Sequence, residues 1–171
     1  EFEDHVTVFK SDNPTGISHY LKNYMRSIGK ETYNPVEIFD KESGENKILH
    51  LRDRYIPNNP QTYVICLFDH VALLKTESKM NKKEKIDKLT EYMIDYRDWF
   101  GITPVFIQQL NRSITSDERF KQGRVEPQLS DFKESGDTSD AANFVMALFS
   151  PMRHEINEYR GYMINPKNGG F

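Results

Sequence analysis

Apolar residues recur every three or four positions in two stretches of the chain, and this spacing predicts two amphipathic helices. The first helix is indicated by Ile17, Tyr20, Leu21, Tyr24 and Ile28. Turn-forming residues precede it, and Gly29 ends it. The second helix is indicated by Ile86, Leu89, Met93, Tyr96 and Phe100, with Gly101 at its end. The mixed charges of residues 75–88 fit the solvent-exposed face of that helix.

Short apolar runs predict the strands. We expect a short strand at residues 6–9 and buried strands at residues 63–68 and 104–109. Residues 36–40 and 47–51 flank a polar turn and predict a hairpin. Further strand candidates are residues 143–149 and 162–164, whereas the polar region 111–140 predicts loops with one helical turn.

The order strand, helix, strand between residues 63 and 109 predicts a parallel sheet, and hence an α/β fold. A length of 171 residues fits one domain. Apolar residues make up 37% and charged residues 29%, a balance that excludes collagen-like and most disordered chains. The single cysteine, Cys66, excludes a disulfide framework and a cysteine-based zinc site.

Net charge narrows the choice of partners. The chain carries a formal charge of −3, so any nucleic-acid site must be local. The longest apolar stretch, residues 64–74, is short and is interrupted by Asp69 and His70, so no membrane partner is expected.

His70 and His154 are lone histidines, which are more typical of surface or core positions than of metal ligands.

Asp69 directly follows an apolar strand. Ligands of α/β sheets bind at the carboxyl ends of the strands, where a carboxylate can hold Mg²⁺ directly or through water. The alternative is that Asp69 only caps a turn. At the end of the next parallel strand, Gln108, Gln109 and Arg112 offer amides and a guanidinium, groups that bind phosphate. The alternative there is a polar strand end that satisfies backbone groups.

A third candidate is the run Ser-Asp-Phe-Lys-Glu-Ser-Gly at residues 130–136. Lys133 supplies a positive charge, and Gly136 allows the backbone to come close to a phosphate chain. From its composition alone, the same run is typical of a solvated loop.

Taken in order, these segments resemble the C-terminal ATPase domain of DnaB-type replicative helicases, a branch of the RecA-like P-loop ATPases. Residues 64–74 resemble the Walker B strand, residues 105–113 the strand that ends in the phosphate-sensing glutamine, and residues 129–136 the central-channel loop. The resemblance covers residues 63–171, whereas residues 1–62 match poorly. It implies a RecA-like core, a mainly parallel sheet flanked by helices, within a single partial domain over residues 1–171.

The resemblance implies a role for each matching residue. Asp69 would coordinate the magnesium ion of ATP, and Gln109 would sense the γ-phosphate. Arg112, Lys133, Glu134 and Gly136 would lie along single-stranded DNA. Lys167 occupies the position of the family's arginine finger, which reaches the ATP site of a neighbouring subunit in a hexameric ring; lysine lacks the two-pronged guanidinium.

The phosphate-binding motif Gly-x-x-x-x-Gly-Lys-Ser/Thr does not occur in the sequence. We therefore expect the C-terminal half of a helicase ATPase domain, incomplete on its N-terminal side, from a bacterial or phage protein of the bacterial cytoplasm. The alternative is a non-catalytic RecA-like binding module that has lost its nucleotide site. A recombinase-like or clock-like ATPase would share Asp69 and Gln109 but is not expected to share the run at residues 130–136.

Overall fold

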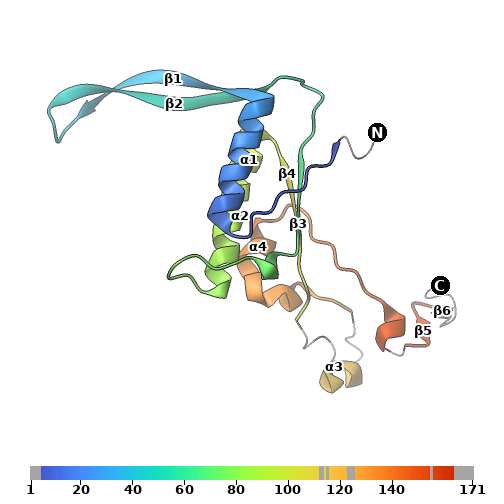
Figure 1. Ribbon diagram of the computed structural model, residues 1–171. Helices are drawn as coiled ribbons and strands as arrows, with labels where there is room; N and C mark the ends of the chain where they lie inside the picture. The colour runs from blue at the N-terminus through green and yellow to red at the C-terminus, as the bar shows by residue number, and fades with distance from the viewer. Residues whose placement is uncertain (1–4, 112–113, 115, 123–125, 155, 164–171) are drawn as a thin grey trace. The chain divides into compact units, whose positions relative to one another are not determined.

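The computed structural model describes residues 5–111, 114, 116–122, 126–154 and 156–163. These residues belong to two compact units, Glu1–Ile107 and Gln108–Phe171, and each unit is described by itself. The first unit holds two long helices, a parallel strand pair and a long hairpin; the second holds short helices and a small hairpin (Figure 1).

Both predicted helices are confirmed. Helix α1 spans Pro14–Ile28 and begins where the side chain of Asn13 accepts a hydrogen bond from the Gly16 N–H at 2.8 Å. Helix α2 spans Lys82–Phe100. Asn81 and Glu84 form a reciprocal capping box at its start, and Gly101 ends it with φ +73°, a left-handed conformation that favours glycine.

Strands β3 (Ile65–Asp69) and β4 (Thr103–Ile107) pair in parallel on either side of α2 in the sequence, as the strand–helix–strand order predicted. The expectation that both strands are fully buried is wrong. Burial alternates along β3: Cys66 is buried, whereas Ile65 and Leu67 are 68% and 61% exposed. One face of the pair packs on the helices, and its other face is open.

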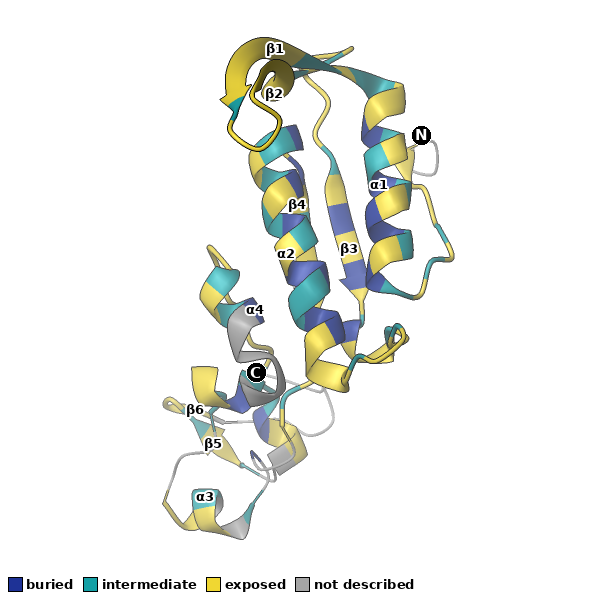
Figure 2. Cartoon of the chain, turned by 90° about the vertical axis from the view of Figure 1, so that its left-hand side faces the viewer, coloured by how far each residue is buried: buried dark blue, intermediate teal, exposed yellow. Residues whose placement is uncertain are grey.

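The core of the first unit lies between α1, α2 and the covered face of β3 (Figure 2). Its buried side chains are Ile17, Leu21, Met25, Cys66, Phe68, Val71, Ile86, Leu89, Met93, Tyr96, Phe100 and Ile102. Val71 belongs to a 3-10 turn, η2 (Val71–Leu73), which follows β3 directly. Helix packing therefore fixes the position of the strand end that carries Asp69.

The predicted hairpin is confirmed and is longer than expected: β1 spans Gly29–Asp40 and β2 spans Glu45–Pro57. It starts directly at the end of α1 and projects away from the helices (Figure 1). At its base the Tyr55 hydroxyl donates to the Met25 carbonyl at 2.7 Å. A Cβ on Gly29 would lie 2.2 Å from the Tyr55 hydroxyl oxygen, so this close approach requires glycine.

The second unit is more helical and less stranded than the sequence indicated. The region predicted as loops contains α3 (Asp117–Lys121), η4 (Leu129–Ser135) and α4 (Gly136–Ala141). Farther on are η5 (Pro151–His154) and an antiparallel pair, β5 (Glu158–Tyr159) and β6 (Tyr162–Met163). Residue 164 of the last predicted strand lies outside the described residues.

Two predicted strands are wrong. Residues 6–9 and 143–149 form no strand, because neither segment has a partner strand among the described residues. Phe9 instead stacks on Tyr20 of α1, with ring centres 4.4 Å apart.

The structure does not show the mainly parallel sheet that the sequence led us to expect. Its described sheets have two strands each, and only β3–β4 is parallel.

Candidate functional site

Asp69 is the last residue of β3 and is exposed. The alternation of β3 puts it on the open face, with Ile65 and Leu67. The register pairs it with Ile107, the last residue of β4, so the carboxyl ends of the two strands are level. This is the edge at which parallel sheets bind ligands. The structure therefore places Asp69 where the sequence predicted it.

His70 follows Asp69 through a cis peptide bond and begins the η2 turn. Its Nδ1 atom is buried and has no hydrogen-bond partner among the residues that the structure describes. Those same residues contain no group of three histidine, cysteine or acidic side chains able to hold a metal ion. A metal at Asp69 would thus need most of its ligands from another molecule, such as nucleotide phosphates and water.

Gln109 lies two residues beyond the end of β4 and is exposed, whereas Gln108 is half-buried. Both belong to the second unit, and Asp69 belongs to the first. Asp69 thus ends β3, and Gln109 comes shortly after the end of β4, the strand that pairs with β3. Arg112 and Lys167, the other predicted phosphate-contacting cations, lie outside the described residues.

The predicted DNA-contacting run forms short helical turns with a kink at Phe132 and is not an open loop. Lys133 and Glu134 lie in η4, and Gly136 begins α4; the side chains of Lys133 and Glu134 lie outside the description. The backbone from Ser130 to Ser135 therefore turns tightly and is not extended.

Asp131 is a residue of this run whose role the sequence did not reveal. Its side chain is almost fully buried, accepts the Gln128 N–H at 2.7 Å and pairs with the Arg119 guanidinium. Its backbone carbonyl accepts the Asn111 N–H at 3.0 Å. Burial by itself would raise the pKa of Asp131, but Arg119 and the Gln128 N–H outweigh it, and the pKa is lowered. A charged Asp131 thus anchors the start of the run.

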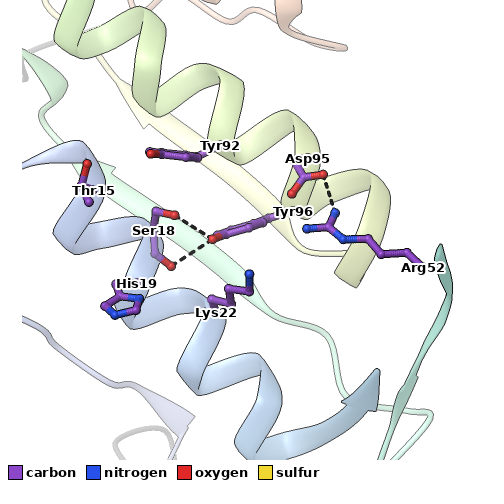
Figure 3. A pocket seen from close by; sticks show the side chains of 8 residues that line it. All are labelled: Thr15, Ser18, His19, Lys22, Arg52, Tyr92, Asp95 and Tyr96. Atoms are coloured by element: carbon purple, nitrogen blue, oxygen red, sulfur yellow. Dashed lines mark hydrogen bonds and ion pairs between the residues drawn. The ribbon is translucent and has the colours of Figure 1, made fainter. Parts of the chain in front are cut away.

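The first unit also has a hollow of about 340 Å³ on its helical side, which the sequence did not indicate (Figure 3). It is lined by Thr15, Ser18, His19, Lys22, Arg52, Tyr92, Asp95 and Tyr96. The Ser18 and Tyr96 hydroxyls lie 2.7 Å apart at its floor, and the Arg52 guanidinium lies 2.7 Å from the Asp95 carboxylate. These contacts join α1, α2 and β2.

No helix among the described residues is long and apolar enough to cross a bilayer. Neither the curated proteins nor the solved structures gave a match to the chain. The family model described as the DnaB-like helicase C terminal domain matches residues 8–166. That match spans nearly the whole sequence and includes the hairpin and α1, which the resemblance in the motifs did not cover. The chain therefore belongs to the family of DnaB-like helicase C-terminal domains.

Proposed function

We propose that the chain is part of a replicative helicase that couples ATP hydrolysis to movement along single-stranded DNA and to duplex unwinding. The observation that carries this proposal is the level carboxyl edge of β3 and β4. Asp69 ends the first strand opposite Ile107, and Gln109 follows the second strand by two residues. The membership in the helicase family supports it.

Asp69 would hold the magnesium ion of bound ATP. A single exposed carboxylate fits this ion, because Mg²⁺ is usually bound through one or two carboxylates together with substrate phosphates and water. Bound there, Mg²⁺ would neutralise charge on the phosphates. Gln109 would hydrogen-bond the terminal phosphate, and Lys167 would extend a positive charge to the ATP site of the next subunit.

The second unit would contact single-stranded DNA. Lys133 and Arg112 offer positive charge to phosphates, Glu134 would orient Lys133, and Gly136 leaves room for the strand near the backbone. Six copies in a ring would present these contacts repeatedly along one strand, so that weak single contacts add up. Such a helicase would act in the bacterial cytoplasm, as a bacterial or a phage protein.

One observation favours a second candidate function. The sequence has no Gly-x-x-x-x-Gly-Lys-Ser/Thr motif, and phosphoryl transfer depends on the charge and positioning that such a motif supplies. A RecA-like module that binds DNA or protein without hydrolysing ATP would fit this composition. We therefore expect the 171-residue chain alone not to hydrolyse ATP at a helicase-like rate.

The deciding experiment reads the gene upstream of the codon for Glu1 and expresses the full reading frame. An in-frame phosphate-binding motif and DNA-stimulated ATP hydrolysis support the helicase. Asp69→Asn should then lower the hydrolysis rate by on the order of 100-fold. Asp98→Asn, which changes an exposed carboxylate on α2, is the matched control and should leave the rate unchanged. Equal rates in both variants would contradict the role of Asp69.

Two further variants separate the other roles. Gln109→Ala should lower the turnover number more than the affinity for ATP, because its contact strengthens as charge develops in the transition state.

Lys133→Ala should weaken binding to oligonucleotides of any sequence. It should also flatten the slope of log affinity against log salt concentration by roughly 0.7 per lost contact. An unchanged salt slope in the assembled ring would show that Lys133 does not touch DNA.

A further inference from the structure

The two faces of the β1–β2 hairpin have different surroundings. Directly paired residues of an antiparallel ladder share a face, and successive pairs alternate between faces. The inner face carries Glu31, Arg52 and Tyr55 and rests on α2. The Trp99 indole N–H donates to Glu31 at 3.2 Å, and the Arg52 guanidinium lies 5.1 Å from the Trp99 ring centre. The opposite face is therefore turned away from the helices.

This outer face carries four apolar side chains at its centre. Val36 pairs with Leu49, and the neighbouring same-face positions hold Ile38 and Leu51. Their side chains are 37%, 44%, 39% and 51% exposed, respectively. A two-stranded hairpin is at best marginally stable in water, and a contiguous exposed apolar patch on such a ribbon marks an interaction surface.

Two exposed charged residues, Glu45 and Arg54, lie equally far from the Val36–Leu49 pair. Toward the tip, the second pair on this face is Asp40–Glu45, and Lys47 is ion-paired to Asp40. Toward the base, the second pair is Thr32–Arg54, and Asp53 lies 3.3 Å from the Arg54 guanidinium. Both ends of this face thus carry charges of both signs, and the centre is apolar. A half-turn about the centre exchanges the position of Glu45 with that of Arg54.

We propose that the outer face of the hairpin binds the same face of a second copy of this chain, with a two-fold axis at Val36 and Leu49. In this arrangement Val36 and Leu49 of the two copies pack on each other at the axis, with Ile38 and Leu51 beside them, as two stacked sheet layers. Glu45 of each copy meets Arg54 of the other. The contact is isologous, in contrast to the head-to-tail contacts that close a ring.

Both the size and the charge of the hairpin favour this partner. Strands of 12 and 13 residues extend about 40 Å, and one face of each would bury on the order of 1,000 Å² in total, the lower end for specific interfaces. Nucleic acid is a poor fit, because residues 29–57 carry six carboxylates against five basic side chains.

Analytical ultracentrifugation of the 171-residue chain, without ATP or DNA, tests the proposal independently of the proposed helicase function. The chain should show a concentration-dependent monomer–dimer equilibrium. Leu49→Glu should weaken the dimer at least about tenfold, because it puts a charge at the centre of the interface. Ile48→Glu is the matched control: the neighbouring residue is 65% exposed on the inner face, so dimerisation should not change.

Charge reversal tests the two-fold geometry. Glu45→Arg alone and Arg54→Glu alone should each weaken the dimer, and the double variant should restore it, because each reversed charge then meets its complement across the axis. Circular dichroism checks that every variant keeps its fold. A chain that stays monomeric at all concentrations, equal effects of Leu49→Glu and Ile48→Glu, or no rescue in the double variant would overturn the proposal.

Discussion

Glu77 shows how a single side chain joins two helices that are far apart in the sequence. One carboxylate oxygen accepts the Thr15 N–H at 2.8 Å, at the first turn of α1, where an unpaired backbone donor and the positive end of the helix favour an anion. The other oxygen lies 2.6 Å from the ammonium of Lys88 on α2. Lys88 also donates to the Thr15 hydroxyl at 2.9 Å, so the three residues form a closed group.

We predict that this group makes the stability of the chain depend on pH. The Lys88 hydrogen bond, followed by the Thr15 N–H, lowers the pKa of Glu77 from 4.5 to about 2. Because the folded pKa is the lower one, this stabilisation is fully present above pH 4.5 and is lost as the pH falls toward 2. Glu77→Gln should lower the urea midpoint at pH 7 and flatten its fall between these pH values.

Glu91→Gln, which changes an exposed carboxylate on α2, the helix that carries Lys88, is the control for this measurement. Urea midpoints at several pH values give the comparison. If Glu77→Gln and Glu91→Gln retain the same pH dependence as the parent chain, the Glu77 group does not contribute to the acid response.

Residues whose position depends on local context could be predicted, and contacts between residues distant in sequence could not. The place of Asp69 at the end of a strand was predictable because an apolar run followed by a carboxylate is visible in the sequence itself. Glu77 and Thr15 are 62 positions apart, and nothing in the sequence indicates that they meet. Asp131 was within a recognised run, but its burial became visible only with Arg119 and Gln128 in place.

At the scale of elements, the two long helices were predicted better than the strands. The boundaries of α1 and α2 are set by features close in sequence: an asparagine at each start, a glycine after each end and an apolar period between. Strands need a partner. Residues 143–149 have the composition of a strand but no ladder among the described residues, whereas β3 forms because β4 lies alongside it.

The capping box of α2 gives an element-scale prediction. The Asn81 side chain accepts the N–H groups of Lys83 and Glu84 at 2.8 and 3.0 Å, and the Glu84 carboxylate accepts the Asn81 N–H at 2.8 Å. Asn81→Ala should therefore lower the free energy of unfolding by about 1 kcal/mol. Asn23→Ala, at an exposed position within α1, should not destabilise the chain. Urea unfolding measures both, and equal effects would contradict the capping role.

At the scale of the whole molecule, the family was predictable from short motifs, but the arrangement of strands was not. The motifs near Asp69 and Gln109 identified a helicase-type ATPase domain, which the match over residues 8–166 confirms. The expected mainly parallel sheet was inferred from that family. The described structure has one parallel pair and a long hairpin, whose register depends on pairing between residues up to 28 positions apart.

The buried core of the first unit leads to a prediction about cooperativity. Leu89 is fully buried among side chains from α1, α2 and β3, so Leu89→Ala should lower the free energy of unfolding by about 2–5 kcal/mol. Hydrogen exchange followed by mass spectrometry should then show faster exchange in α1, α2, β3 and β4 together, because these elements open as one unit. Residues 142–150, which form no helix or strand, serve as a fast-exchanging internal reference. Leu73→Ala, at a side chain that is 71% exposed, is the matched control and should leave all rates nearly unchanged. Acceleration confined to α2 would show that the helices and the strand pair do not form one cooperative core.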